Sequence, residues 1–148
     1  MNKTVDWYLK DRELNKLDHR NQVRFALRCG SICYFDRDSL AVIDAVEGWL
    51  EGRVSESEVD SLITEKMRFS RTGSEDDVAC LIAETVLTAD SHSHLSASYA
   101  AESAWDVLRF SAGSTPEGCE MFREDLMRYL WELVNVDSVI ETTVLGAV

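Results

Sequence analysis

Residues 94–110, HLSASYAAESAWDVLRF, decide the fold class of this chain. Apolar side chains recur in this stretch at helical spacing, at Ala97, Ala100, Ala101, Ala104, Trp105 and Leu108. This spacing follows the helical period of about 3.6 residues and gives a helix one apolar stripe, which must pack against a core. We therefore expect a long amphipathic helix near residues 92–111.

Helical spacing continues on both sides of this stretch. A second apolar stripe is formed by Cys119, Phe122, Leu126, Tyr129, Leu130 and Leu133. The chain has one proline in 148 residues, so few positions forbid a helix. The pattern predicts helices near 3–13, 18–35, 39–51, 56–69, 75–89, 92–111 and 116–135. Segment 75–89 has only a thin polar edge, so we expect it at the centre of the fold. Residues 136–148 form a tail of uncertain structure, either a last helical turn or an extended segment.

Residues with capping chemistry stand at several expected helix ends. Ser55 and Glu58 fit a capping box, and Thr115 precedes a proline at the first helical position of the next helix. Glycines stand where helices should stop, at Gly52, Gly73 and Gly113. Because the connections are short, neighbouring helices should run antiparallel. We expect an all-α fold in which residues 1–148 form a single domain, a bundle of about six or seven antiparallel helices arranged as stacked helical hairpins.

Charge is divided unevenly along the chain. Residues 72–148 hold 14 acidic and 3 basic residues, whereas residues 1–71 hold 13 acidic and 12 basic ones. The second half therefore carries 11 of the 12 net negative charges. Such a surface attracts basic partners and repels the phosphates of nucleic acids and of anionic membranes. We expect a basic partner protein, and no direct binding to nucleic acid or to a membrane.

Several features are typical of a cytoplasmic protein. The N-terminal stretch MNKTVDWYLKDREL has no apolar core of the kind found in secretory signals. No apolar run approaches the roughly 18 residues that span a bilayer. The four cysteines are scattered through apolar helical patterns, which favours reduced thiols.

The acidic residues of the second half fall into two groups. Some lie in first helical turns, where the helix dipole favours negative charge, namely Glu75, Asp76, Asp77, Glu117 and Glu120. Others lie elsewhere on the helices, and from these we take the predicted partner-binding residues Glu102, Asp106, Glu124, Asp125 and Glu132.

Asp90, His92 and His94 are the nearest approach to a metal site in the sequence. On a helix, Asp90 and His94 would share a face at a usable ligand spacing. His92 would point elsewhere, and the strong spacing of metalloprotease histidines is absent. The simpler interpretation is a polar helix start capped by Asp90 or Ser91, and we expect no cofactor.

Two other clusters have both a functional and a simpler interpretation. Cys29 and Cys33 are four residues apart on a predicted helix and could offer two thiolates, but their apolar neighbours favour core packing. A basic stripe is formed by Lys16, Arg20, Arg24 and Arg28. It could bind phosphates or acidic proteins, although contact with the acidic half of the same molecule, or exposure to solvent, is the simpler expectation. The sequence contains no nucleophile elbow, phosphate-binding glycine loop or dinucleotide fingerprint.

Residues 24–63, RFALRCGSICYFDRDSLAVIDAVEGWLEGRVSESEVDSLI, resemble a family of all-helical bacterial immunity proteins. The matching positions, which run from a helix with a cysteine through an aspartate-rich turn to a capped helix, are Cys33, Asp36, Asp38, Ile43, Ala45, Trp49, Glu51, Gly52 and Ser55. HSHLSASYAAESAW (92–105) resembles the His- and Ala-rich helix of the family, and EMFREDLMRYLWELV (120–134) its closing amphipathic helix. The resemblance covers about residues 22–135 and implies a helical fold that neutralises a toxin by binding it. It carries over no catalytic residue.

The leading hypothesis is a non-enzymatic, all-α binding protein of the cytoplasm that neutralises a basic partner protein, as an immunity protein does. An inhibitor from a phage or mobile element that mimics DNA, and so blocks a nucleic-acid-binding defence enzyme, is the alternative. A small metal-dependent enzyme built on the Asp90, His92 and His94 cluster is a further alternative. A homodimer could form through exposed apolar residues, for which the candidates are Trp7, Tyr8, Trp131, Val144 and Leu145.

Overall fold

The computed structural model describes residues 7–63, 75–88 and 92–146, and within these ranges it contains helices and no strands. The predicted all-α helical bundle is therefore confirmed. The elements are α2 (Lys10–Asn15), α3 (His19–Cys29), the short 3-10 helix η1 (Gly30–Ile32), α4 (Arg37–Leu50), α5 (Glu56–Leu62), α7 (Glu75–Leu87), α8 (Ser93–Arg109) and α9 (Pro116–Gly146).

Short polar side chains begin several of these helices, as their capping chemistry predicts. Asp36 accepts a hydrogen bond from the backbone N–H of Ser39 at 2.8 Å, and Ser55 accepts one from the N–H of Glu58 at 3.1 Å. Thr115 caps α9 in the same way through the N–H of Gly118 at 3.0 Å. Each bond satisfies a backbone donor that the first turn of a helix leaves without a partner. Gly52 and Gly113 follow α4 and α8 with positive φ angles of 80° and 82°, a conformation that favours glycine.

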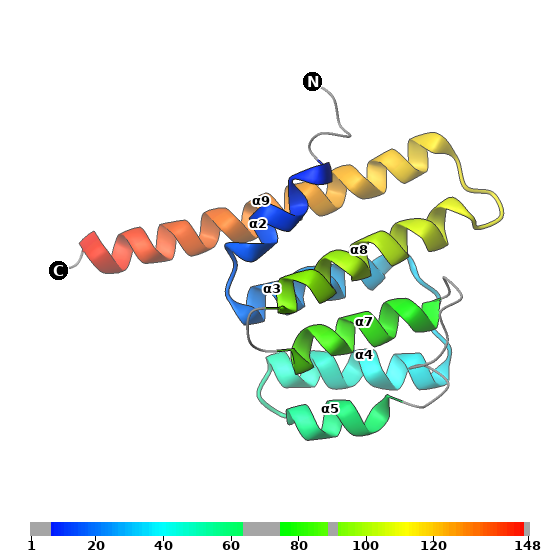
Figure 1. Cartoon of the computed structure of the whole chain (residues 1–148), viewed down its shortest axis with the longest axis horizontal. Coiled ribbons are helices and arrows are strands. Elements are labelled where there is room, and N and C mark those ends of the chain that lie inside the picture. The colour runs from blue at the N-terminus through cyan, green and yellow to red at the C-terminus, as the bar shows by residue number, and fades with distance from the viewer. Residues whose placement is uncertain (1–6, 64–74, 89–91, 147–148) are drawn as a thin grey trace.

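Helix α7 lies at the centre of the bundle, as its thin polar edge predicts. It packs against α3, α4, α5 and α8 (Figure 1). Its buried residues include Val78, Ile82 and Val86. The alanine stripe of α8, at Ala97, Ala100, Ala101 and Ala104, is fully buried. Since alanine is small, α8 can approach α7 and α3 closely along this stripe.

Three predicted boundaries differ from the structure. The helix expected over 18–35 ends at Cys29, continues as η1 and then becomes extended at Cys33. The helix expected over 56–69 is helical through Leu62, and its last residues lie outside the described ranges. The helix expected over 3–13 corresponds to α2, which runs to Asn15.

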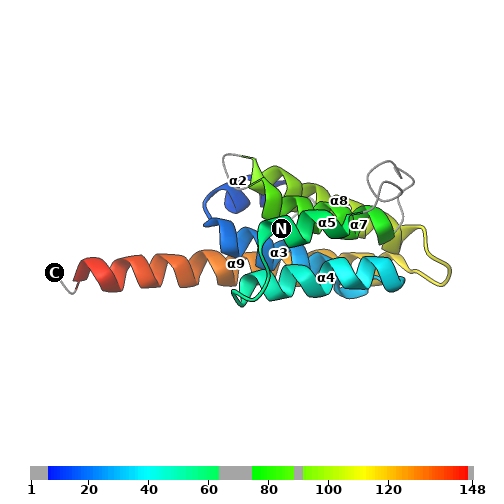
Figure 2. The same cartoon turned by 90° about the horizontal axis from the view of Figure 1, so that it is seen from below.

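Helix α9 is much longer than the helix expected over 116–135. It continues without a break to Gly146 as a single helix of 31 residues, which is about 46 Å long at the usual rise per residue. The tail therefore extends the helix over most of its length, because no proline or glycine interrupts residues 119–145. The C-terminal part of α9 extends away from the other helices (Figures 1 and 2). In the described part of the chain, no helix is both long enough and apolar enough to cross a membrane.

Candidate functional site

Glu102, the first predicted partner-binding residue, holds the N-terminal segment against α8. Its carboxylate accepts a hydrogen bond from Trp7 Nε1 at 3.1 Å and pairs with Lys10 Nζ at 2.6 Å. Trp7 is 3% exposed and Lys10 is 4% exposed. Glu102 therefore compensates a buried charge within its own chain. Trp7 is likewise not available as a surface for a homodimer.

Two more of the predicted residues also have partners inside the molecule. Asp125 on α9 makes a bidentate pair with Arg28 on α3, with N–O distances of 3.1 and 3.0 Å. This hydrogen bond is the main reason that the pKa of Arg28 is raised, and the charge of Asp125 adds to the effect. Asp106 pairs with Arg109 one helical turn away at 2.7 Å. The predicted contact between the basic stripe and the acidic half is thus present at Arg28.

Cations and aromatic rings alternate where α2, α8 and α9 meet. Arg123 lies 5.1 Å from the ring centre of Trp7 and 3.8 Å from that of Trp105. Arg109 lies 4.1 Å from the Trp105 ring, and Lys10 lies 4.9 Å from the Trp7 ring. We call this set the cation–aromatic ladder, defined as Lys10, Trp7, Arg123, Trp105 and Arg109. Two of the three basic residues in the acidic half, Arg109 and Arg123, therefore stack on aromatic rings of the same molecule.

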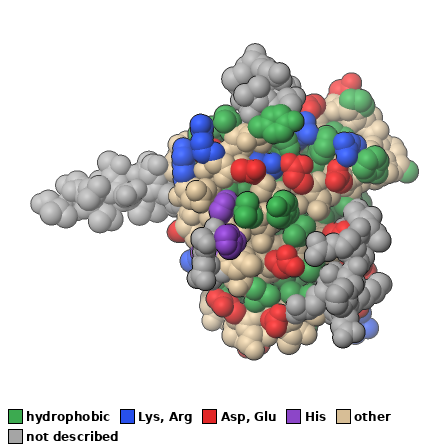
Figure 3. Space-filling model, in the orientation of Figure 1, with side chains coloured by type: hydrophobic (Ala, Val, Ile, Leu, Met, Phe, Trp, Pro, Cys, Tyr) green, Lys and Arg blue, Asp and Glu red, His purple; other side chains and the backbone are tan. Residues whose placement is uncertain are grey.

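Another acidic part of the surface lies along the outer side of α9. Met121 is 68% exposed and lies in a groove of about 380 Å³. The groove, which we call the α9 acidic groove, is lined by Pro116, Glu117, Glu120, Met121 and Glu124. Further along the helix, Glu132 is exposed and Trp131 is 41% exposed. On the face shown in Figure 3, acidic side chains are interspersed with hydrophobic ones and do not form one continuous row.

The predicted metal cluster is only partly within the described residues. Asp90 and the alternative cap Ser91 lie outside them. His92 is exposed just before α8, and His94 is half-buried in its first turn. Within the ranges that the structure covers, no group of three His, Cys, Asp or Glu side chains is arranged to hold a metal ion.

The cysteines pack as apolar residues. Cys29 is fully buried and its thiol donates to the carbonyl oxygen of Phe25 at 3.3 Å. Burial raises the pKa of Cys29 above that of an ordinary thiol, and it raises the pKa of Cys33 to about 12. Burial therefore disfavours the thiolate form of both residues, in keeping with their packing among apolar side chains. All four cysteines are free thiols and form no disulfide.

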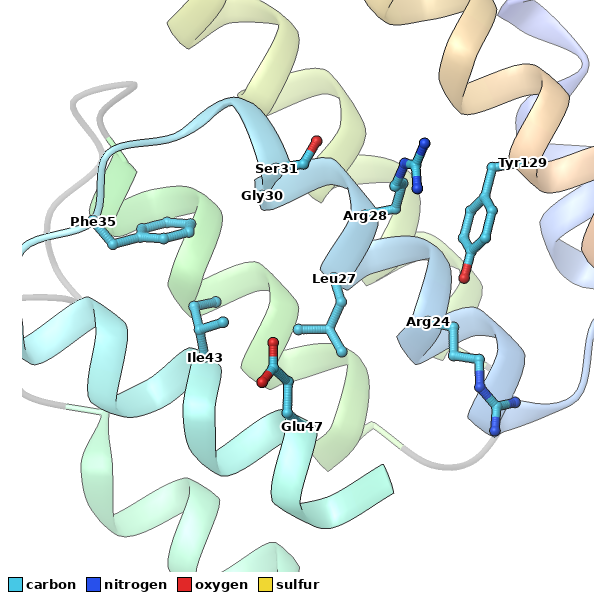
Figure 4. A pocket seen from close by; sticks show the side chains of 9 residues that line it. All are labelled: Arg24, Leu27, Arg28, Gly30, Ser31, Phe35, Ile43, Glu47 and Tyr129. Atoms are coloured by element: carbon cyan, nitrogen blue, oxygen red, sulfur yellow. The ribbon is translucent and has the colours of Figure 1, made fainter. Parts of the chain in front are cut away.

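A second groove, which the sequence did not predict, lies between α4 and α9 above α3 (Figure 4). Its volume is about 390 Å³. We call it the α3–α4–α9 groove. Its lining includes the apolar residues Leu27, Phe35 and Ile43 and the polar residues Arg24, Arg28, Tyr129 and Glu47. Leu27 and Ile43 point toward each other from α3 and α4 (Figure 4).

Two arginines of α3 line this groove, and one of them, Arg28, is paired with Asp125 on α9. Arg28 lies 5.2 Å from the ring centre of Tyr129, and Arg24 donates to Asn21 Oδ1 at 2.6 Å. Burial raises the pKa of Tyr129, opposed by the charges of Arg24 and Arg28. The spacing of Arg24 and Arg28 was a sequence signal for a basic surface. Its apolar neighbours could not be recognised, because they come from separate helices.

Comparison of the chain with models of protein families, with curated proteins and with solved structures gave no match. The resemblance to immunity proteins therefore stays a prediction from sequence. The two grooves and the charge distribution are the features from which a function can be inferred.

Proposed function

We propose that this protein is a non-enzymatic binding protein that neutralises a basic partner protein through the outer side of α9. The observation that carries the proposal is the charge distribution, in which 11 of 12 net negative charges belong to residues 72–148. In these residues Arg109 and Arg123 are held by the cation–aromatic ladder. The third cation, Arg128, is exposed on α9 and lies four residues from both Glu124 and Glu132. The outward surface of α9 therefore carries several carboxylates around one arginine.

Within the predicted partner-binding residues, we give most weight to those on α9. Glu102, Asp106 and Asp125 have partners in the same molecule. Glu124 and Glu132 lie on α9, where Glu117 and Glu120 add to the acidic surface. Glu120 pairs with Arg123 at 3.5 Å, and Glu124 also has a partner within the chain. We place the interface on the α9 acidic groove and on the helix surface that continues to Glu132, because exposed Glu117, Met121 and Glu132 lie along this side of α9.

The chemistry of the α9 acidic groove suits a lysine or arginine side chain. Such a residue has an apolar stem and a charged head. Met121 and Pro116 offer apolar contact for the stem, while Glu117, Glu120 and Glu124 offer carboxylates for the head. Charged hydrogen bonds of this kind fix orientation, and the net charge of −12 would speed the approach of a basic protein.

A protein toxin is the partner that these features favour, and it is the partner that the immunity family implies. A mimic of DNA, the alternative, needs carboxylates arranged as regularly as phosphates. The α9 acidic groove, where Pro116 and Met121 lie among the carboxylates, supports a protein-specific interface instead.

The proposal can be tested by affinity capture from the native host followed by binding measurements. The test variant is Glu117→Lys/Glu124→Lys/Glu132→Lys, which keeps Asp125 because that residue pairs with Arg28. The matched control is Glu56→Lys/Glu58→Lys/Asp60→Lys on the exposed side of α5. We expect a basic protein to bind the wild type and the control with equal affinity, and the test variant at least about tenfold more weakly. Equal affinity for all three proteins would contradict the α9 interface.

The metal-dependent enzyme is tested separately by elemental analysis of the purified full-length protein. Stoichiometric zinc, iron or manganese that is lost in a His92→Ala/His94→Ala variant would support the enzyme and contradict the non-enzymatic proposal. A metal content that these substitutions leave unchanged would contradict the predicted cluster.

A further inference from the structure

Two features described above have no function in a single copy of the chain. The C-terminal part of α9 extends beyond the other helices in both views (Figures 1 and 2). The α3–α4–α9 groove is an open channel with an apolar floor. We propose that these features fit each other between two copies: the C-terminal part of α9 in one copy lies in the α3–α4–α9 groove of the other, and this exchange forms a two-fold symmetric dimer.

The geometry of the bundle makes the groove a place for a helix. Both α4 and α9 pack against α3, and the groove is the space between them above α3. Helices pack in such a space by placing apolar side chains between those of their neighbours. Leu27, Phe35 and Ile43 supply an apolar surface for that contact.

The extension of α9 needs such a contact. A helical segment of this length is marginal in water unless it packs against something. In the sequence, apolar residues continue at helical spacing after Leu133, at Val136, Ile140 and Val144. This pattern is typical of a helix that packs along one side.

The charges of the two parts are complementary. Residues 129–148 contain Glu132, Asp137 and Glu141 and no lysine, arginine or histidine. Arg24 and Arg28 of α3 line the groove, with Glu47 of α4. Arg28 is already paired with Asp125, which leaves Arg24 as the groove cation for the carboxylates of the extension. The charge of Arg24 would favour the approach of an acidic helix to this groove.

A two-fold axis between the copies would bring the extension of α9 and the α3–α4–α9 groove together in both copies. Tyr129 lies in the groove and belongs to α9 shortly before the helix leaves the body. If two α9 helices run antiparallel, the extension of each copy passes the groove of its partner. The contact is then made twice, as a two-fold interface requires.

Glu132 belongs both to the proposed partner interface and to this extension, so the test variants leave it unchanged. The inference is tested with the full-length chain by sedimentation equilibrium. We expect the wild type to be a dimer. The variants Arg24→Glu, in the groove, and Asp137→Lys/Glu141→Lys, in the extension, should each raise the dimer dissociation constant at least about tenfold. The control Glu56→Lys/Asp60→Lys on α5 should leave that constant unchanged.

Mixing the two variants gives the decisive measurement. In a mixed dimer, the groove that carries the Arg24→Glu substitution meets the lysine-bearing extension, while the unchanged groove of the other copy meets the unchanged extension. Dimerisation should therefore recover in the mixture to within a few-fold of the wild type. A monomeric wild type would overturn the inference, and so would a dimer that the variants do not weaken or that mixing does not restore.

Discussion

At the scale of single residues, a carboxylate that pairs with a buried cation contributes to the stability of the fold, whereas an exposed carboxylate contributes little. Glu102 lies 2.6 Å from Lys10 Nζ, whose side chain is 4% exposed. Glu102→Ala would leave this buried ammonium with the longer contact to Asp11 at 3.5 Å and with the Trp7 ring at 4.9 Å. We expect the free energy of unfolding to fall by about 1–3 kcal/mol, measured by urea denaturation. The matched control Glu132→Ala removes an exposed carboxylate and should change the same quantity by less than about 0.5 kcal/mol. Equal losses in both variants would contradict the buried pair.

The half-buried thiol of Cys33 gives a second prediction at this scale, for pH. Its pKa is raised from 9.0 to about 12, first because burial disfavours the thiolate and also because Glu75 is near. Between these values the folded state keeps a proton that the unfolded state has lost, so stability falls as pH rises through this range. We expect the urea midpoint to decrease from pH 8 to pH 10.5, and to decrease less in Cys33→Ala. An identical pH dependence in the two proteins would show that Cys33 is not responsible.

The internal partners of Glu102 could not be predicted from the sequence, for a physical reason. Glu102 belongs to the polar part of the α8 pattern, and from the sequence alone it is indistinguishable from an outward carboxylate. Its hydrogen-bond partner Trp7 is 95 residues away in the chain. Whether such a residue faces solvent depends on which helix covers it, and local periodicity does not contain that information.

At the scale of the helices, the cation–aromatic ladder fixes how α2 sits on α8 and α9. Arg123, whose side chain is 15% exposed, stands between the rings of Trp7 and Trp105. Arg123→Met keeps the length of the side chain and removes its charge, which should cost about 1–2 kcal/mol. We expect the amides of α2 to lose protection from hydrogen exchange, while those of the central helix α7 change little. A uniform loss over both helices would mean that the ladder stabilises the bundle as a whole and does not hold α2 in particular.

Helix positions were predicted well because they depend on local signals. The alanine stripe of α8 and the caps at Ser55 and Thr115 are complete within a few residues, and the structure has each of them. The end of α9 was not predicted, because a helix stops at a specific residue and residues 119–145 contain neither glycine nor proline. The α3–α4–α9 groove was not predicted because it needs the relative positions of three helices.

At the scale of the whole molecule, the net charge of −12 should make the fold more stable when salt is added. Internal pairs such as that of Arg28 with Asp125 are attractive and lose strength in salt, but carboxylates of the second half greatly outnumber its cations. Screening therefore removes more repulsion than attraction, since the Debye length falls to about 8 Å at physiological ionic strength. We expect the melting temperature to rise by a few degrees between about 10 and 300 mM NaCl.

The variant Glu117→Lys/Glu124→Lys/Glu132→Lys provides the comparison for this salt effect. Each Glu→Lys substitution changes the net charge by +2, so the three substitutions together halve the net charge of −12. The increase in melting temperature with salt should shrink by a similar proportion, because repulsion between charges falls as the net charge falls. If the variant and the wild type respond equally, the repulsion does not come from α9. The acidic surface of this helix would then carry little of the electric field that the proposed function needs to attract a basic partner.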